Sequence, residues 1–328
     1  MKLEISDLFA TMQPELLRVE SRVRDAARID FPFVSPLILD LVEAGGKRLR
    51  PLVLLLAARA YRFEVETLVT AAAGVELLHT ASLVHDDTVD RSALRRGKPT
   101  LNSVLNSGAV ILIGDYLFAQ SAMLAAATKS PRVVAVFAST LADICDGQLR
   151  EIFDAHRLDQ SRAEYDRRIY GKTAALFAGA AEMGAIIGEA PESHIETVRR
   201  YGTDVGLAFQ IVDDVLDLRE GTDGLGKPGG QDLRQGTVTL PIMLYAEKLP
   251  DGSEESRLLR AVLSGEQSEP AAIDQVIRAV RASGTLDETL AQAARLTDRA
   301  KDRLSIIPDP ETKAMLDQVA DIVWERTT

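Results

Sequence analysis

The sequence has little cysteine and no excess of basic residues. Cys145 is the single cysteine among 328 residues, which excludes an intrachain disulfide and indicates a reducing compartment. We expect Cys145 to be a packing residue. Lys and Arg number 38 against 49 Asp and Glu, for a net charge of −11. This balance argues against a nucleic-acid-binding protein, which normally carries a broad basic patch. It leaves room for a local basic pocket that binds an anionic ligand.

Long apolar runs are also missing. The most apolar stretch, residues 51–58, is shorter than the ~18 residues that a membrane span needs. The N-terminal residues MKLEISDLFATMQPELL carry acidic side chains where a signal peptide would have an apolar core. We therefore expect a cytoplasmic protein with no membrane span.

Alternating β-branched runs are absent too, and the apolar residues repeat with helical spacing. Ser35-Pro36 is typical of a helix start and Gly45-Gly46 of a stop. Further long helices are predicted at residues 65–90, 107–128, 131–155, 162–187 and 192–218. A glycine-rich loop is predicted at 220–235, with shorter helices after Pro250. No Pro- or Ser-rich linker divides the chain, so the pattern favours one all-α domain, a helix bundle over residues 1–328.

The end of the first long helix carries the acidic pattern DDxxD. Asp86 and Asp90 are four residues apart and share one helix face, with Asp87 beside them. Like charges at this spacing repel, and the helix dipole disfavours negative charge at a C-terminus. A cation would compensate both costs. Oxygen ligands of this kind suit Mg²⁺, which binds one or two carboxylates together with water and substrate phosphates.

The same pattern recurs at the end of another long helix, in Asp213, Asp214 and Asp217. One copy alone could be a solvated helix end. Two copies, each preceded by an apolar helix, favour a metal-binding rim in which the motifs face each other across the bundle.

Basic residues that could bind an anionic ligand held near these acids occur at four separate places. Arg suits bidentate phosphate contacts and Lys suits point-charge contacts. Each base alone is more simply a solvated surface charge, but together with two acidic motifs they indicate diphosphate sites. They are Lys47, Arg48 and Arg50 in one loop, Arg95 and Arg96, Lys172 before Thr173, and Lys227.

Several segments resemble the motifs of the trans-isoprenyl diphosphate synthases, also called polyprenyl synthetases, and in that family's order. They are GGKRLRP, ELLHTASLVHDDTVDRSALRRGKPT, GDYLFA, GKTAALF, FQIVDDVLD and GKPGGQDL, which span most of the chain. The resemblance implies antiparallel helices around a deep central cavity, a homodimer, and a Mg²⁺-dependent prenyltransferase. Such an enzyme joins isopentenyl diphosphate to an allylic diphosphate, for which we expect farnesyl or geranylgeranyl diphosphate.

The resemblance also implies a role for each matching residue. Asp86, Asp87 and Asp90 would hold Mg²⁺ on the allylic diphosphate, and Asp213, with Asp214 and Asp217, would hold another. Arg95, Lys172 and Lys227 would contact the allylic diphosphate. Lys47, Arg50, His79 and Arg96 would bind isopentenyl diphosphate. Thr173 and Gln210 would stabilise the allylic cation.

Product length is expected to depend on the residues five and four positions before Asp86, which are Ala81 and Ser82. In the family, bulky aromatic residues at these positions limit growth of the tail. Both are small here, so the sequence resembles long-chain synthases. The alternatives are a farnesyl or geranylgeranyl diphosphate synthase, or the catalytic subunit of a heteromeric polyprenyl synthase. The second DDxxD motif argues against a terpene cyclase, because terpene cyclases usually have a different second metal motif.

Overall fold

The computed structural model describes residues 5–44, 46–95, 97–219 and 229–324. It is an all-α fold, as predicted, and its described residues form two strands of only two residues each, Leu94–Arg95 (β1) and Lys98–Pro99 (β2), which pair antiparallel. The chain divides into two compact units. Unit 1 contains residues 1–142, 176–202 and 301–320, and unit 2 contains residues 143–175, 203–300 and 321–328. The expectation of a single domain over 1–328 stays a prediction.

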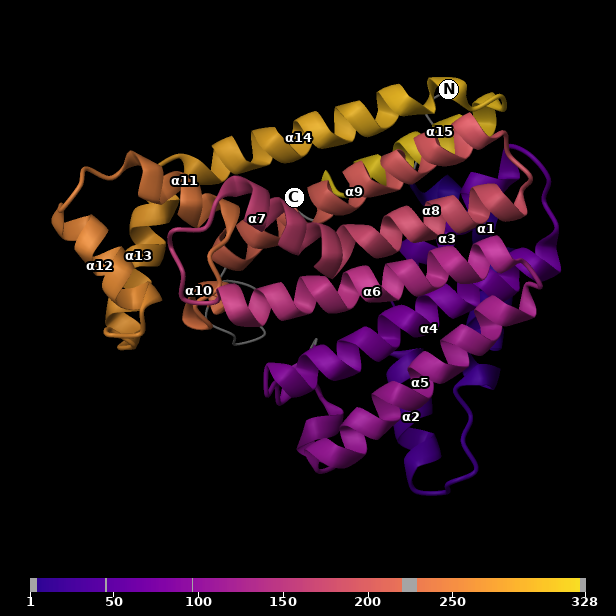
Figure 1. Cartoon of the computed structure of the whole chain (residues 1–328), viewed down its shortest axis with the longest axis horizontal. Coiled ribbons are helices and arrows are strands. Elements are labelled where there is room, and N and C mark those ends of the chain that lie inside the picture. Colours follow the sequence, from indigo (N-terminus) through magenta and orange to yellow (C-terminus); the bar gives the residue numbers. More distant parts are fainter. Residues whose placement is uncertain (1–4, 45, 96, 220–228, 325–328) are drawn as a thin grey trace. The chain divides into compact units, whose positions relative to one another are not determined.

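Unit 1 is built around one apolar helix, α4. Its long helices are visible in Figure 1, where α4 and α5 run side by side. The elements of this unit are α1 (Ile5–Ala26), α2 (Val34–Glu43), α3 (Leu49–Arg59), α4 (Val65–Val89), α5 (Ser107–Ala127), α15 (Pro310–Asp321), and the 3₁₀ turns Leu101–Ser103 and Leu304–Ile306. It also contains most of α8 (Ala175–Ile187). Since α1, α3 and α5 all pack on α4, α4 is buried along most of its length.

Unit 2 contains the second acidic motif and a set of shorter helices. Its elements are α7 (Arg162–Ile169), the π-helical segment Tyr170–Ala174, α10 (Gln231–Arg234), α11 (Leu240–Lys248), α12 (Glu254–Leu263), α13 (Pro270–Ala282) and most of α14 (Thr285–Arg303). Two long helices, α6 (Pro131–Asp154) and α9 (Glu192–Arg219), contribute their N-terminal parts to unit 1 and their C-terminal parts to unit 2.

The long helices agree closely with their predicted ranges, with three corrections. The helix expected at 162–187 is interrupted by the π-helical segment. The helix expected to start with Ser35 as its cap begins at Val34 instead. The loop expected at 220–235 contains α10, and its residues 220–228 lie outside the described part. Cys145 is exposed, which contradicts the expectation that it is a packing residue.

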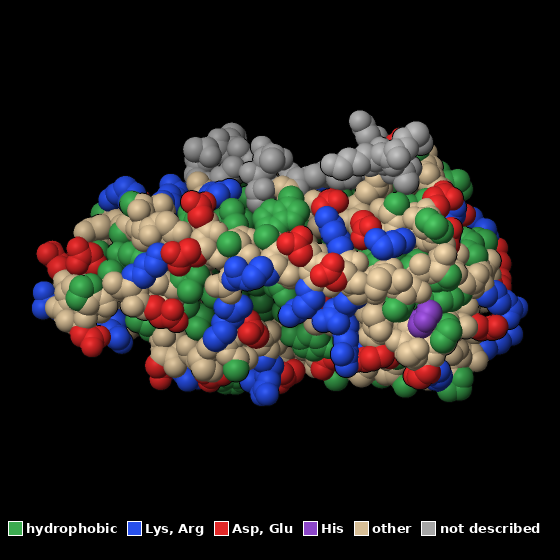
Figure 2. All heavy atoms as spheres, turned by 90° about the horizontal axis from the view of Figure 1, so that it is seen from above, with side chains coloured by type: hydrophobic (Ala, Val, Ile, Leu, Met, Phe, Trp, Pro, Cys, Tyr) green, Lys and Arg blue, Asp and Glu red, His purple; other side chains and the backbone are tan. Residues whose placement is uncertain are grey.

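Two helices are long and apolar enough to cross a membrane by length and composition, which the sequence estimate did not anticipate. They are α4 and α5, whose most apolar windows are 78% and 39% buried inside the protein. For α4 the burial fits the core helix of a folded unit. The face shown in Figure 2 carries acidic and basic side chains interspersed over its surface.

Candidate active site

The first acidic motif lies in the last turn of α4 and is tied to β1. Arg95 donates from Nε to both carboxylate oxygens of Asp87, at 2.8 and 2.9 Å. Asp87 is buried, whereas Asp86 is half-buried and Asp90 is exposed. The structure thus brings together Asp87 and Arg95. Asp86 and Asp90 are more accessible than Asp87, which makes them the better candidates for metal ligands.

The basic residues around the start of α3 lie in different environments, one paired within the protein and others accessible or beside His79. Arg48 has a left-handed φ of 48° and points inward, where it pairs with the buried Glu76 and donates to the carbonyl oxygen of Val42 at 2.8 Å. Lys47 is exposed. Arg50 lies 3.2 Å from Nε2 of His79 and stacks over the ring of Phe177 at 4.6 Å.

The structure therefore brings together Arg50 and His79, as the resemblance implied. It assigns Arg48 a structural role, because its guanidinium is paired with the carboxylates of both Glu20 and the buried Glu76.

In unit 2 the π-helical segment carries Lys172 and Thr173. A π turn inserts one extra residue into a helix and is frequent at functional sites. Here it lies against α6 with no side chain between the backbones: a Cβ atom added at Gly171 would lie 2.5 Å from the carbonyl oxygen of Asp143, and one at Gly147 would overlap the backbone nitrogen of Lys172. Two glycines therefore allow this close approach.

Lys172 and Thr173 each have a partner on a neighbouring helix. Lys172 Nζ donates to Glu151 Oε2 on α6 at 2.6 Å. Thr173 Oγ1 donates to Gln210 Oε1 on α9 at 2.5 Å. The structure thus brings Thr173 and Gln210 together, and their shared role in stabilising a cation stays a prediction. Sequence reasoning missed Glu151, although an acid one turn beyond the glycine of α6 was the available signal.

In the second acidic motif, Asp214 and Asp217 accept hydrogen bonds from other residues of unit 2. Asp214 is buried and accepts from Tyr165 Oη at 2.7 Å and from Gln210 Nε2 at 2.9 Å. Asp217 accepts from the backbone nitrogens of Gln231 and Asp232, at 2.9 and 3.0 Å. Asp213 is half-buried and stays the metal ligand that the resemblance implied first for this motif.

Burial raises the pKa values of this acidic group. It raises the pKa of Asp214 to about 6, against the opposing effect of hydrogen bonds from Gln210 and Tyr165. It also raises the pKa of Asp217, and that of Asp232 rises well above its ordinary value because of burial and the neighbouring Asp217. Sequence reasoning missed both Tyr165 and Asp232. Clustered carboxyl groups with raised pKa values are typical of functional sites.

The two residues expected to control product length lie in the middle of α4. Ala81 is completely buried, and Ser82 is half-buried with its hydroxyl donating to the carbonyl oxygen of His79 at 2.8 Å. Two expected substrate contacts, Arg96 and Lys227, lie outside the described residues.

The carboxylates of the first acidic motif match the coordination that Mg²⁺ prefers. Among the residues that the structure describes, no three His, Cys, Asp or Glu side chains converge into a closed metal cage. Mg²⁺ does not need one, since it keeps several waters and is usually held by one or two carboxylates and substrate phosphates. Asp86 and Asp90, one helical turn apart and accessible at the end of α4, fit that requirement.

The fold and these motifs match one family over most of the chain. The polyprenyl synthetase family model matches residues 32–280. Heptaprenyl diphosphate synthase component 2 of Geobacillus stearothermophilus is 35% identical, over 99% of each chain. Octaprenyl diphosphate synthase of Haemophilus influenzae is 33% identical, over 99% of this chain and 98% of its own.

A solved structure adds the three-dimensional comparison. It is a polyprenyl synthase from Caulobacter crescentus complexed with calcium and isoprenyl diphosphate. It aligns with a TM-score of 0.93 at 34% identity, over 100% of this chain and 99% of its own. The chain therefore belongs to the polyprenyl synthetase family and is a prenyltransferase of the isoprenoid synthase fold.

Proposed function

We propose that this protein condenses isopentenyl diphosphate with an allylic diphosphate, in the presence of Mg²⁺, to make a long trans-polyprenyl diphosphate. The observation that carries the proposal is the cluster in unit 2, where the π-helical segment joins Lys172 and Thr173 to Gln210 and to the second acidic motif. A cation, two neutral oxygens and a carboxylate cluster fit a reaction in which diphosphate leaves and a carbocation forms.

Each group of residues has a separate task in this reaction. Lys47, Arg50 and His79 bind the diphosphate of isopentenyl diphosphate. Lys172 exchanges its contact with Glu151 for the allylic diphosphate, and Arg95 and Lys227 assist it. Asp86, Asp90 and Asp213 would hold Mg²⁺, which supplies charge neutralisation for the leaving diphosphate. Positive groups aimed at that developing charge lower the barrier because they act mainly in the transition state.

The bond changes balance without a further reactant. The allylic C–O bond breaks and its electron pair leaves with diphosphate. The double bond of isopentenyl diphosphate attacks the allylic cation, and a proton is then lost to the departing diphosphate. Binding both substrates at fixed anion sites removes an entropic cost of the encounter, and the oxygens of Thr173 and Gln210 stabilise the positive charge.

We propose a long-chain product because Ala81 and Ser82 are small and the Geobacillus and Haemophilus relatives are named for products of seven and eight isoprene units. The test is incubation of purified protein with farnesyl diphosphate, labelled isopentenyl diphosphate and Mg²⁺, followed by sizing of the product. Products longer than four isoprene units are expected, and farnesyl or geranylgeranyl products would support the short-chain alternative.

Removal of the metal tests the Mg²⁺ requirement. EDTA should abolish turnover and added Mg²⁺ should restore it. Mg²⁺ with inorganic diphosphate should also raise the melting temperature of the wild type, because a ligand that binds only the folded state stabilises it. Asp86→Ala and Asp213→Ala should each lose that rise and lower kcat by orders of magnitude. Full turnover in metal-free buffer would refute the role of the motifs.

We further propose a cytoplasmic homodimer. Support comes from α5, which exposes the apolar side chains of Ile111, Leu112 and Met123, at 45%, 68% and 63%. The Geobacillus relative is named as one component of its enzyme. A heteromer, in which this chain is the catalytic subunit, is therefore the second candidate. Activity of the purified chain alone supports the homodimer.

A further inference from the structure

The second acidic motif contains a chain of hydrogen bonds that runs from a buried tyrosine to the Thr173–Gln210 pair. Tyr165 Oη donates to Asp214 Oδ2, Gln210 Nε2 donates to Asp214 Oδ1, and Thr173 Oγ1 donates to Gln210 Oε1. All four residues belong to unit 2. From this geometry we infer that Tyr165 and Asp214 are positioning residues, which orient Gln210 and Thr173 toward a positive charge. The inference rests on the proposed function.

The direction of each bond follows from which atoms can donate. Asp214 accepts on both oxygens, so it faces the amide nitrogen of Gln210 and turns the amide oxygen toward Thr173. Thr173 uses its only hydroxyl proton on that oxygen. The hydroxyl proton of Thr173 and one of the two amide hydrogens of Gln210 are thus already used, and lone pairs remain on Thr173 Oγ1 and Gln210 Oε1. Such an arrangement stabilises a cation and disfavours an anion.

Tyr165 holds Asp214 in place because its ring is itself fixed. The side chain is completely buried, between the guanidinium groups of Arg162 and Arg168 at 5.7 and 5.5 Å from its centroid. Arg168 is anchored in turn by donating to Gln160 Oε1 at 2.9 Å and to the carbonyl oxygen of Val238 at 2.6 Å.

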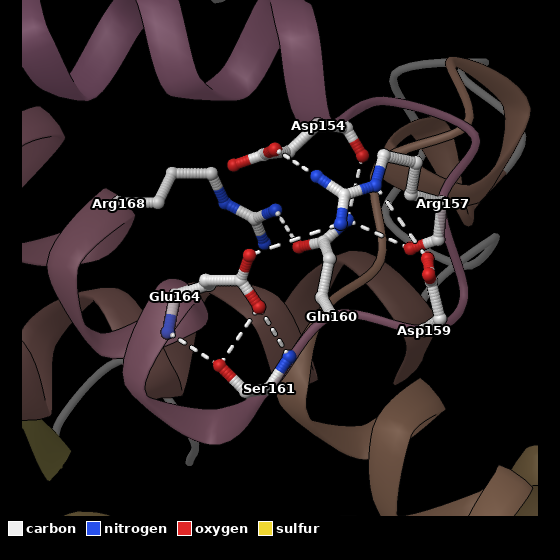
Figure 3. A network of polar contacts seen from close by, with 7 residues as sticks. All are labelled: Asp154, Arg157, Asp159, Gln160, Ser161, Glu164 and Arg168. Atoms are coloured by element: carbon white, nitrogen blue, oxygen red, sulfur yellow. Dashed lines mark hydrogen bonds and ion pairs between the residues drawn. The ribbon is translucent and has the colours of Figure 1, made fainter.

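Figure 3 shows how the start of α7 supports this arrangement. Ser161 and Glu164 form a capping box, in which the Ser161 side chain accepts from the backbone of Glu164 and the Glu164 side chain accepts from the backbone of Ser161. Gln160, next to this cap, points its side chain to Arg168. The capping box and the Gln160–Arg168 hydrogen bond therefore hold the start of α7, the helix that carries Tyr165.

The test compares Tyr165→Phe with Tyr201→Phe. Tyr201 is equally buried in unit 1 and donates to the carbonyl oxygen of Leu316 at 2.7 Å, so both variants lose one buried phenol hydrogen bond of the same length. Tyr165→Phe should lower kcat about 10-fold, since one such bond is comparable to a tenfold change in rate. The KM values for both substrates should stay within twofold of wild type. Tyr201→Phe should keep kcat.

A binding measurement separates positioning from loss of structure. The probes are two unreactive allylic diphosphate analogues, one with a positively charged nitrogen near C1 and one with a neutral sulfur link. Tyr165→Phe should bind the charged analogue about 10-fold more weakly and the neutral one unchanged. Asp214→Asn, which keeps the side-chain shape, is the second variant, to be measured in place of Tyr165→Phe if that variant does not fold. It should show the same selective loss of affinity for the charged analogue.

Equal weakening for both analogues, or no change in kcat, would overturn the positioning role. If the wild type itself makes no prenyl product from allylic and isopentenyl diphosphates, the proposed function fails. A wild type that is active beside a normal Tyr165→Phe variant refutes the positioning role alone.

Discussion

Two arginines at the start of α3, the N-cap residue Arg48 and Arg50 in the first turn, have different environments. Arg48 is buried against Glu76, whereas Arg50 lies beside His79 and stacks on Phe177. Sequence spacing places three bases together, but only side-chain direction separates the structural one from the candidate ligand-binding ones. The same distinction applies to the second acidic motif, where Asp214 and Asp217 accept hydrogen bonds from the protein.

Replacing Arg50 tests the isopentenyl diphosphate site. Arg50→Ala should raise the KM for isopentenyl diphosphate roughly 10-fold or more, because a hydrogen bond to a charged group contributes about 1.5–3 kcal/mol. The KM for the allylic substrate should change little. Arg59→Ala, at the other end of α3 and 3.7 Å from Glu311, is the control. Equal increases for both substrates would contradict separate anion sites.

Replacing Ala81 tests control of product length. Ala81→Phe adds a ring at a completely buried position, and overpacking typically costs about 1–3 kcal/mol of stability. If the growing tail passes this residue, products should shorten while the first condensation stays near the wild-type rate. Chromatographic sizing of the products measures this. Ala57→Phe, equally buried on α3, should lose stability without shortening them, and unchanged products from Ala81→Phe would show that the tail takes another path.

At the level of elements, the π-helical segment is the feature on which the site depends most. It interrupts the continuous helix expected at 162–187 and carries both Lys172 and Thr173. Its contact with α6 depends on the absence of side chains at Gly147 and Gly171. The close approach of the two backbones therefore fixes the positions of the two candidate site residues, Lys172 and Thr173.

A methyl group at Gly171 should displace that segment. Gly171→Ala should lower kcat at least 10-fold, because the new Cβ would meet the carbonyl oxygen of Asp143 and Lys172 and Thr173 would shift with the backbone. Gly252→Ala is the matched control, because Gly252 has a φ of +71° and open space around it, so that variant loses stability through backbone strain alone. Thermal unfolding and steady-state kinetics on both variants separate the effects. Normal kinetics in Gly171→Ala would argue against the dependence.

At the scale of the whole molecule, the apolar face of α5 sets the expected assembly. Leu112→Asp places a charge on the most exposed large apolar residue of that helix and should shift the protein from dimer to monomer in sedimentation velocity. Leu17→Asp, at an exposed leucine on α1, is the control and should leave the dimer intact. A monomeric wild type, or a dimer in both variants, would contradict a dimer formed through α5.

The sequence by itself determined the helical class, most of the long helices and the family motifs. Apolar spacing predicted a helix over residues 65–90, and α4 ends at Val89. Such features are local: they follow from backbone hydrogen bonding, caps and the repeat of apolar side chains, all of which are encoded within a few turns of chain.

Only the tertiary structure decided how the motif side chains are used. In the folded chain Asp87 pairs with Arg95, and Asp214 accepts hydrogen bonds from Tyr165 and Gln210. A π turn forms at Tyr170–Ala174. These outcomes depend on residues that are distant in sequence, such as Tyr165 and Asp214, and on backbone contacts such as that between Gly147 and Gly171. A sequence motif identifies a carboxylate, but it does not identify the hydrogen-bond partners of that carboxylate, because only tertiary packing brings those partners within reach.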